Sequence, residues 1–138
     1  MDATYDIETN LAAQEDRSVA IVAPQWLQDG LAVVIKSIPN LHLVACTGSI
    51  NTLLLIDLEH SPDLVVLTLD IPDTKANHPI RQVKFVYPQA RCLALIQEVE
   101  QSASARAAGA DETLLQGASA DIFCAAVRRL ILRDEVGN

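Results

Sequence analysis

An unbroken apolar run followed by a polar cluster is the feature that most constrains how this chain can fold. The run extends from Leu64 to Leu69 without alternating polar residues, and Asp70 and Asp73 follow it. A strand without alternation is typical of the centre of a parallel sheet, where helices cover both faces. Doubly wound sheets bind ligands at the carboxyl ends of their strands. The polar cluster therefore predicts where a functional site would lie.

Apolar runs and helical repeats alternate along the rest of the chain, which predicts five strands and five helices. The expected strands are residues 18–23, 41–46, 64–69, 91–96 and 112–115. The first expected helix is residues 26–38, and the second is capped by Ser49 or Asn51 and runs to about Glu59. The third follows Pro79 and ends before Pro88, and the fourth is residues 101–108 with Gly109 as its cap. The last is residues 119–133. In the last helix one apolar face is expected from Phe123, Val127 and Ile131 beside Ile122, Ala126 and Leu130. Because crossovers between parallel strands are right-handed, this order is compatible with a three-layer α/β sandwich whose strands are arranged 2-1-3-4-5.

Size and charge limit what the chain is expected to do. Its 138 residues fit one domain, which we expect over residues 17–134, preceded by an acidic, loosely ordered arm (1–16) and followed by a short tail (135–138). The formal net charge of -8 would repel nucleic-acid phosphates, so nucleic-acid binding is not expected. No apolar run approaches the roughly 18 residues that span a membrane, and the acidic N-terminal residues do not resemble a signal peptide. A cytoplasmic protein without membrane contact is expected.

Cysteine and histidine are too scattered to predict a metal site or a disulfide framework. The three cysteines, at positions 46, 92 and 124, lie among apolar residues and are expected to be small buried hydrophobes. The turn after the first strand, Ala23-Pro24-Gln25-Trp26, has no glycine to cradle a phosphate, and no dinucleotide or Walker motif occurs. No cofactor and no metal are expected.

Five motifs in order resemble the receiver domains of response regulators over about residues 17–133. The likeness is greatest to receivers that are joined to a helix-turn-helix output domain. The motifs are Ile38-Pro39-Asn40 with residues 41–45, residues 61–67 beginning Ser61-Pro62-Asp63, residues 87–91 beginning Tyr87-Pro88, residues 106–111 ending Gly109-Ala110-Asp111, and residues 117–121 with the helix that follows. The resemblance implies a flavodoxin-like (CheY-like) fold and a place in two-component signal transduction.

The same resemblance implies that the phosphorylation site has been lost. Receivers phosphorylate an aspartate at the end of strand three, and a pair of acidic residues after strand one helps it to hold Mg²⁺. A hydroxyl or small residue ending strand four and a lysine ending strand five steady the phosphoryl oxygens, and an aromatic residue three positions before that lysine accompanies activation. The matching positions here are Thr68 for the acceptor, Ala23 and Pro24 for the acidic pair, Ile96 for the hydroxyl, Gln116 for the lysine and Thr113 for the aromatic residue.

None of these replacements supplies the chemistry of the residue it replaces. Thr68 has a neutral hydroxyl with no evident base, Ala23 and Pro24 have no side-chain oxygen, and Gln116 carries no charge. We therefore interpret the chain as a non-enzymatic pseudo-receiver that signals through protein contacts, without phosphorylation.

Two alternatives remain open. Asp70, beside Asp73, would serve as a substitute acceptor in a phosphorelay, although loop carboxylates at such places are commonly just solvated. The vacated pocket, bordered by Ala23, Trp26, Thr68, Ile96 and Gln116, would otherwise bind an uncharged small molecule.

Contact surfaces are expected at two places. Four arginines, at positions 106, 128, 129 and 133 (Arg106, Arg128, Arg129 and Arg133), belong to the side of the fold that receivers use for pairing. That side would contact a second copy or another signalling protein such as a histidine kinase, but an ordinary solvated helix face is the interpretation that the pattern favours. Trp26, the only tryptophan, would either anchor an interface or fill the space left by the missing acidic residues.

Overall fold

Five parallel strands form one sheet, and their order is β2-β1-β3-β4-β5, as the sequence predicts. The structure is a computed structural model that describes residues 16–56, 61–69 and 79–136, with side chains as far as Ile131 in the last helix. The expected arm lies outside these residues except for Asp16. The strands are β1 (Arg17–Val22), β2 (Leu41–Thr47), β3 (Leu64–Thr68), β4 (Arg91–Ile96) and β5 (Glu112–Leu115).

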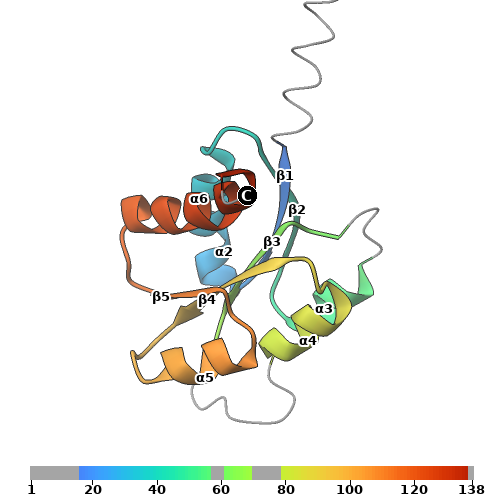
Figure 1. Cartoon of the computed structure of the whole chain (residues 1–138), viewed down its shortest axis with the longest axis vertical. Coiled ribbons are helices and arrows are strands. Elements are labelled where there is room, and N and C mark those ends of the chain that lie inside the picture. The colour runs from blue at the N-terminus through green and yellow to red at the C-terminus, as the bar shows by residue number, and fades with distance from the viewer. Residues whose placement is uncertain (1–15, 57–60, 70–78, 137–138) are drawn as a thin grey trace, which may run out of the picture.

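The helices cover both faces of the sheet (Figure 1), which gives the three layers expected. They are α2 (Gln25–Lys36), α3 (Ile50–Leu55), α4 (Pro79–Val86), α5 (Gln101–Ala108) and α6 (Ala120–Val136). Helices α3, α4 and α5 pack on one face, and α2 and α6 on the other.

Helix ends differ from prediction by a few residues. Helix α2 ends at Lys36 rather than Ile38, because Ser37 caps it and Pro39 cannot continue it. The Ser49 side chain accepts a hydrogen bond from the backbone N–H of Thr52, so Ser49 and not Asn51 caps α3. Helix α6 continues to Val136, three residues beyond its expected end at Arg133.

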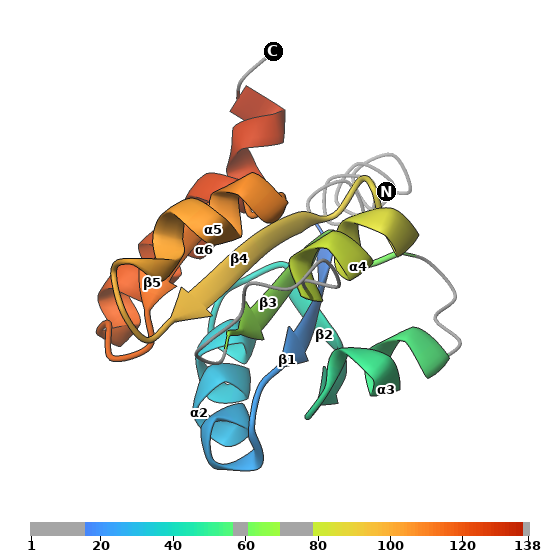
Figure 2. The same cartoon turned by 90° about the horizontal axis from the view of Figure 1, so that it is seen from below.

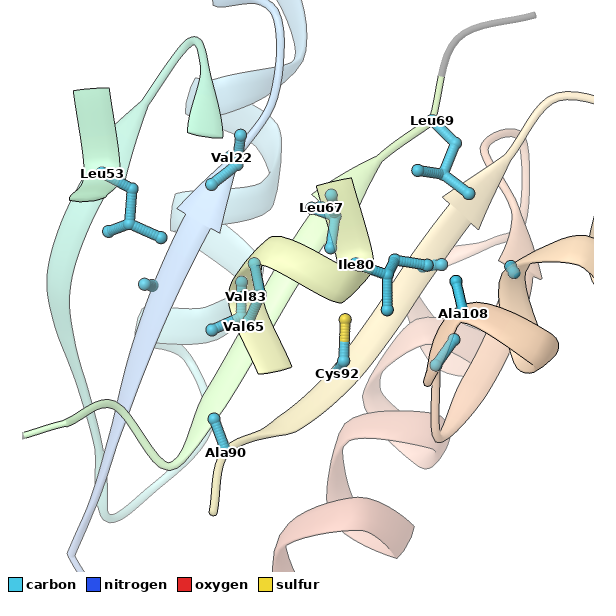
Figure 3. Close-up of a cluster of buried hydrophobic side chains, with 14 of the residues drawn as sticks. Val22, Leu53, Val65, Leu67, Leu69, Ile80, Val83, Ala90, Cys92 and Ala108 are labelled. Carbon is cyan, nitrogen blue, oxygen red and sulfur yellow. The ribbon is translucent and has the colours of Figure 1, made fainter. Parts of the chain in front are cut away.

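The first of two hydrophobic clusters lies under α3, α4 and α5 (Figure 3). Val65 and Leu67 of β3 meet Leu53 of α3 and the α4 residues Ile80 and Val83, all of them almost completely buried. The side chains at alternate positions of β3 point into this cluster because successive residues of a strand face opposite sides.

The second cluster lies between the other face of the sheet and helices α2 and α6. Leu64 and Val66 of β3 point to this side, where they meet Ile35 of α2 and Leu130 of α6. Ile122 is not part of it: the prediction that Ile122 lines the buried face is wrong, because its side chain is 52% exposed. Phe123, Ala126, Val127, Leu130 and Ile131 already fill the arc of α6 that faces the sheet, and Ile122 lies at the margin of that arc.

One carboxylate joins α4, β4 and β5 on the first face. Asp111 Oδ2 accepts hydrogen bonds from the Lys84 ammonium at 2.9 Å and from the backbone N–H of Cys92 at 2.8 Å. The Lys84 ammonium also donates to the carbonyl of Ala90 at 2.7 Å. The predicted cap Gly109 has a φ of 121° and ends α5, and a Cβ there would lie 3.1 Å from Lys84 Cγ. The Gly-Ala-Asp motif is thus explained by a helix end and a partly buried network of hydrogen bonds.

Two leucines of α3 give a matched test of the core. We expect Leu53→Ala to lower the free energy of unfolding by about 2 to 5 kcal/mol, because it empties a fully buried site. Leu55→Ala, on the same helix but 86% exposed, is expected to change it by no more than about 0.5 kcal/mol. Urea unfolding followed by circular dichroism measures both, and equal losses would contradict this assignment of the core.

Candidate functional site

The carboxyl ends of the strands bring four of the predicted site positions to one edge of the sheet. The register pairs Val22 with Leu67, Thr68 with Leu95 and Ile96 with Leu115, so the ends of β1, β3, β4 and β5 are neighbours. The arrowheads of β1, β3 and β4 point to the same edge in Figure 2. Ala23 follows β1, Thr68 and Ile96 end β3 and β4, and Gln116 follows β5.

The turn after β1 is closed by its own backbone and by a glutamine. Ala23 is 1% exposed; its N–H donates to the Thr47 carbonyl at 2.9 Å, and its carbonyl accepts a hydrogen bond from Gln28 Nε2 at 2.8 Å. Gln28 Oε1 in turn lies 3.7 Å from the Cys46 thiol. Gln28 was not singled out from the sequence, because a lone glutamine in an amphipathic helix gives no signal of a tertiary role. At this turn the structure has a methyl group and a proline ring, and no carboxylate.

The ends of β4 and β5 are also occupied by internal contacts. Ile96 is 3% exposed, and its carbonyl accepts the backbone N–H of Gln116 at 2.8 Å. The Gln116 side-chain amide donates to the carbonyl of Leu95 at 3.3 Å. Its polar end is therefore directed at the backbone of β4.

Thr113 is held by a helix on the first face. Its hydroxyl lies 2.9 Å from the Ser102 hydroxyl of α5, and the two form a hydrogen bond. This bond links β5 to α5 at the position where the resemblance places an aromatic residue.

The remaining predicted residues differ in whether the structure describes them. Asp70 and Asp73 lie outside the described residues, as does the side chain of Arg133. Trp26 is 74% exposed, which rules out the core role that was one of its two interpretations.

The arginines lie on both sides of the edge strand β5. Arg106 is exposed on α5, in one layer, and Arg128 and Arg129 are exposed on α6, in the other. Arg129 forms an ion pair with Glu112 of β5, and this hydrogen bond raises the pKa of the Arg129 guanidinium. Glu112 therefore offsets part of the positive charge that the sequence predicts here.

A hollow of about 150 Å³ lies beside the predicted pocket rather than in it. It opens between α2, the end of β5 and the start of α6, and Gln116 is its one residue in common with the prediction. Its walls include Leu27, Gly30 and Val34 of α2 together with Ala118 and Phe123. The sequence signal of this hollow is a set of small residues, Gly30, Ala118 and Ala120, at otherwise apolar positions.

Two searches of the described residues give no further site. Among residues 16–56, 61–69 and 79–136 no three His, Cys, Asp or Glu side chains group as metal ligands would. None of the helices in the same ranges is both long and apolar enough to span a membrane.

The fold is that of response-regulator receiver domains. The beryllofluoride-activated receiver domain of DrrB from Thermotoga maritima is 19% identical, with a TM-score of 0.70 over 86% of this chain and 99% of that one. The receiver of mrkE from Klebsiella pneumoniae is 15% identical (TM-score 0.72; 86% and 98% covered), and that of NarL from Mycobacterium tuberculosis is 18% identical (0.70; 84% and 96%). No protein-family model and no curated protein matches the sequence.

The cysteines follow the prediction only in part, since Cys92 is buried whereas Cys46 and Cys124 are partly exposed. Burial raises the pKa of the Cys92 thiol from 9.0 to about 12. Because the thiolate is the reactive form, we expect iodoacetamide at pH 9 to leave Cys92 unmodified in the folded protein and to modify it in urea. Peptide mass spectrometry measures the labelling of each cysteine.

The same shift predicts how stability depends on pH. Between pH 9 and about 12 the unfolded chain loses the Cys92 proton while the folded protein keeps it, so the contribution of this thiol to stability falls as the pH rises. Labelling of Cys92 in the folded protein as fast as in urea would contradict the burial of this thiol and its raised pKa.

Proposed function

We propose that this chain is a pseudo-receiver: a signalling module of the cytoplasm, not an enzyme, that acts through protein contacts and takes no phosphoryl group. The observation that carries the proposal is the composition of the strand-end edge, where Ala23 and Ile96 are buried and apolar and the Gln116 amide is bonded to the Leu95 carbonyl. The receiver fold supports a role in signal transduction.

Electrostatics argue against phosphoryl transfer at this edge. An aspartyl phosphate with Mg²⁺ brings several charges together, and each needs a ligand or counter-charge because an unpaired buried charge is costly. Ala23, Pro24 and Ile96 supply no side-chain oxygen, and Gln116 supplies an amide in place of a cation. Among the described residues of this edge, a phosphoryl group would find no carboxylate to hold its metal and no cation as its partner.

The hydroxyl pair of Ser102 and Thr113 supports a state that does not depend on phosphorylation. In receivers, as the resemblance implies, an aromatic side chain at the position of Thr113 moves on activation. Here the Thr113 hydroxyl is 2.9 Å from the Ser102 hydroxyl, and this hydrogen bond joins α5 to β5. The surface formed by α5, β5 and α6 would then keep one shape.

The partner that we propose is a protein. A second copy of the chain and a signalling protein of a two-component system, such as a histidine kinase, are the two candidates. Some of the structural neighbours are described as DNA-binding response regulators of the LuxR family. The net charge of -8 argues against DNA contact by this chain itself.

Intact-mass spectrometry with acetyl phosphate and Mg²⁺ tests the proposal. The expected result is no gain of a phosphoryl group by the protein, because the described residues of the strand-end edge do not supply an acceptor carboxylate, metal ligands and a cation together. We expect the Thr68→Asp variant to remain unmodified as well, since a carboxylate at Thr68 would still lack the acidic pair at Ala23 and Pro24. The control is Thr68→Asn, a neutral side chain of similar size, with circular dichroism confirming that both variants fold.

Either kind of adduct would count against the proposal. Phosphorylation of the protein without any substitution would overturn the proposal. Loss of that adduct in Asp70→Asn would then identify Asp70 as the substitute acceptor. Phosphorylation of Thr68→Asp alone would show that the missing acidic pair is not what silences the site.

A further inference from the structure

Helix α2 carries an exposed apolar stripe on the side that faces away from the sheet. Trp26 is 74% exposed and Val33 is 66% exposed. They lie seven residues apart and hence on one face of the helix, with Gly30 between them. The helix lies at the periphery of the molecule (Figure 2), and its opposite face, with Leu31 and Ile35, is buried against the sheet.

Gly30 has no evident role in the single chain. Glycine in the middle of a helix is destabilising by roughly 0.5 to 1 kcal/mol relative to alanine. A Cβ at Gly30 would have no atom of the described protein within 4 Å, apart from its own helix, so no close internal contact requires glycine here. Small residues in exposed helices allow the backbone of another element to approach closely, which points to something that packs against α2 from outside.

The stripe borders the hollow described above. Leu27, Gly30 and Val34 are walls of that hollow, and its volume is about 150 Å³. Apolar cavities of about this volume accept an aromatic ring. One surface therefore presents both an exposed indole and an apolar recess of suitable size.

We propose that this surface is the contact between two copies of the chain, in which their α2 helices cross antiparallel at Gly30. Such a crossing brings residues equally far before and after Gly30 together, so Trp26 of each copy would meet Val33 and Val34 of the other. The indole would then occupy the opening of the second copy's hollow. The contact is two-fold symmetric, because each copy offers the same projection and the same recess.

A second copy is the occupant that the positions favour. Trp26 lies four residues before Gly30, and Val33 and Val34 lie three and four residues after it, so the stripe complements itself when reversed. Its charges do not oppose the pairing, since the exposed part of α2 carries one acidic and one basic side chain, Asp29 and Lys36. The chain as a whole repels its copies through its net charge of -8, so added salt should strengthen the contact.

This dimer contact names a second copy of the chain as the protein partner in the proposed function. Its role in signalling rests on that proposed function. The two can fail separately, because self-association is measured without a phosphodonor.

Sedimentation velocity over a concentration series, from about 1 μM to about 1 mM, tests the contact. We expect a monomer-dimer equilibrium that shifts toward dimer with added salt. The fluorescence of Trp26, the only tryptophan, should move to shorter wavelength over the same concentrations as the indole leaves water. We expect Trp26→Ala to weaken the dimer at least about 30-fold, as truncation of an interface anchor does.

Two further variants distinguish this contact from non-specific self-association. Gly30→Glu places a long charged side chain in open space and removes a glycine from the middle of a helix, so the monomer should melt at the same or a higher temperature while the dimer and the fluorescence shift are lost. Phe85→Ala is the matched control, because Phe85 on α4 is 88% exposed on the other face of the sheet, and it should leave the equilibrium unchanged. A protein that stays monomeric up to about 1 mM would overturn the proposal. A dimer that survives Gly30→Glu, or that is lost in Phe85→Ala but not in Trp26→Ala, would overturn it equally.

Discussion

The burial of β3 on both faces is the constraint on which the rest of the structure depends. Val65 and Leu67 face one cluster, and Leu64 and Val66 face the other, with all four between 0% and 1% exposed. A strand that is apolar on both sides must have helices above and below it, and parallel neighbours reached through those helices. The three layers, the order of the strands and the place of the strand-end edge follow from this one segment.

The same constraint explains how the fold keeps its core whichever residues end its strands. The interior of β3 is held by packing, and its N-terminal end by Asp63, whose carboxylate accepts the N–H of Ser18 at 2.8 Å and whose carbonyl accepts the N–H of Arg91 at 2.9 Å. These interactions lie at the opposite end of the strands from Thr68. Substitution at the carboxyl ends therefore leaves the core and its main hydrogen bonds in place, and the space is taken by Ala23, Ile96 and the contacts of Gln28 and Gln116.

Local patterns predicted the strands well, because burial and chain direction depend on residues close together in the sequence. The bounds of β4, α5 and β5 were predicted to the residue, and Ser49 and Gly109 are the caps that their chemistry favours. Ile122 was placed wrongly because helical periodicity gives a direction and not the width of the surface that the helix covers. The bond from Gln28 to the Ala23 carbonyl, the pairing of Ser102 with Thr113 and the hollow beside α2 depend on how side chains are placed in three dimensions, which sequence spacing alone does not reveal.

The most direct test of the proposal that the strand-end edge binds no phosphoryl group is a titration of the ¹⁵N-labelled protein with Mg²⁺ and then beryllofluoride, followed by backbone amide chemical shifts. Beryllofluoride with Mg²⁺ imitates a phosphorylated aspartate and binds only where a carboxylate, a metal site and a positive partner coexist. We expect no saturable shift of the amides of Ala23, Thr68, Ile96 and Gln116. Saturable shifts of these amides that require both reagents would contradict it, because they would show that the edge still assembles a phosphoryl site.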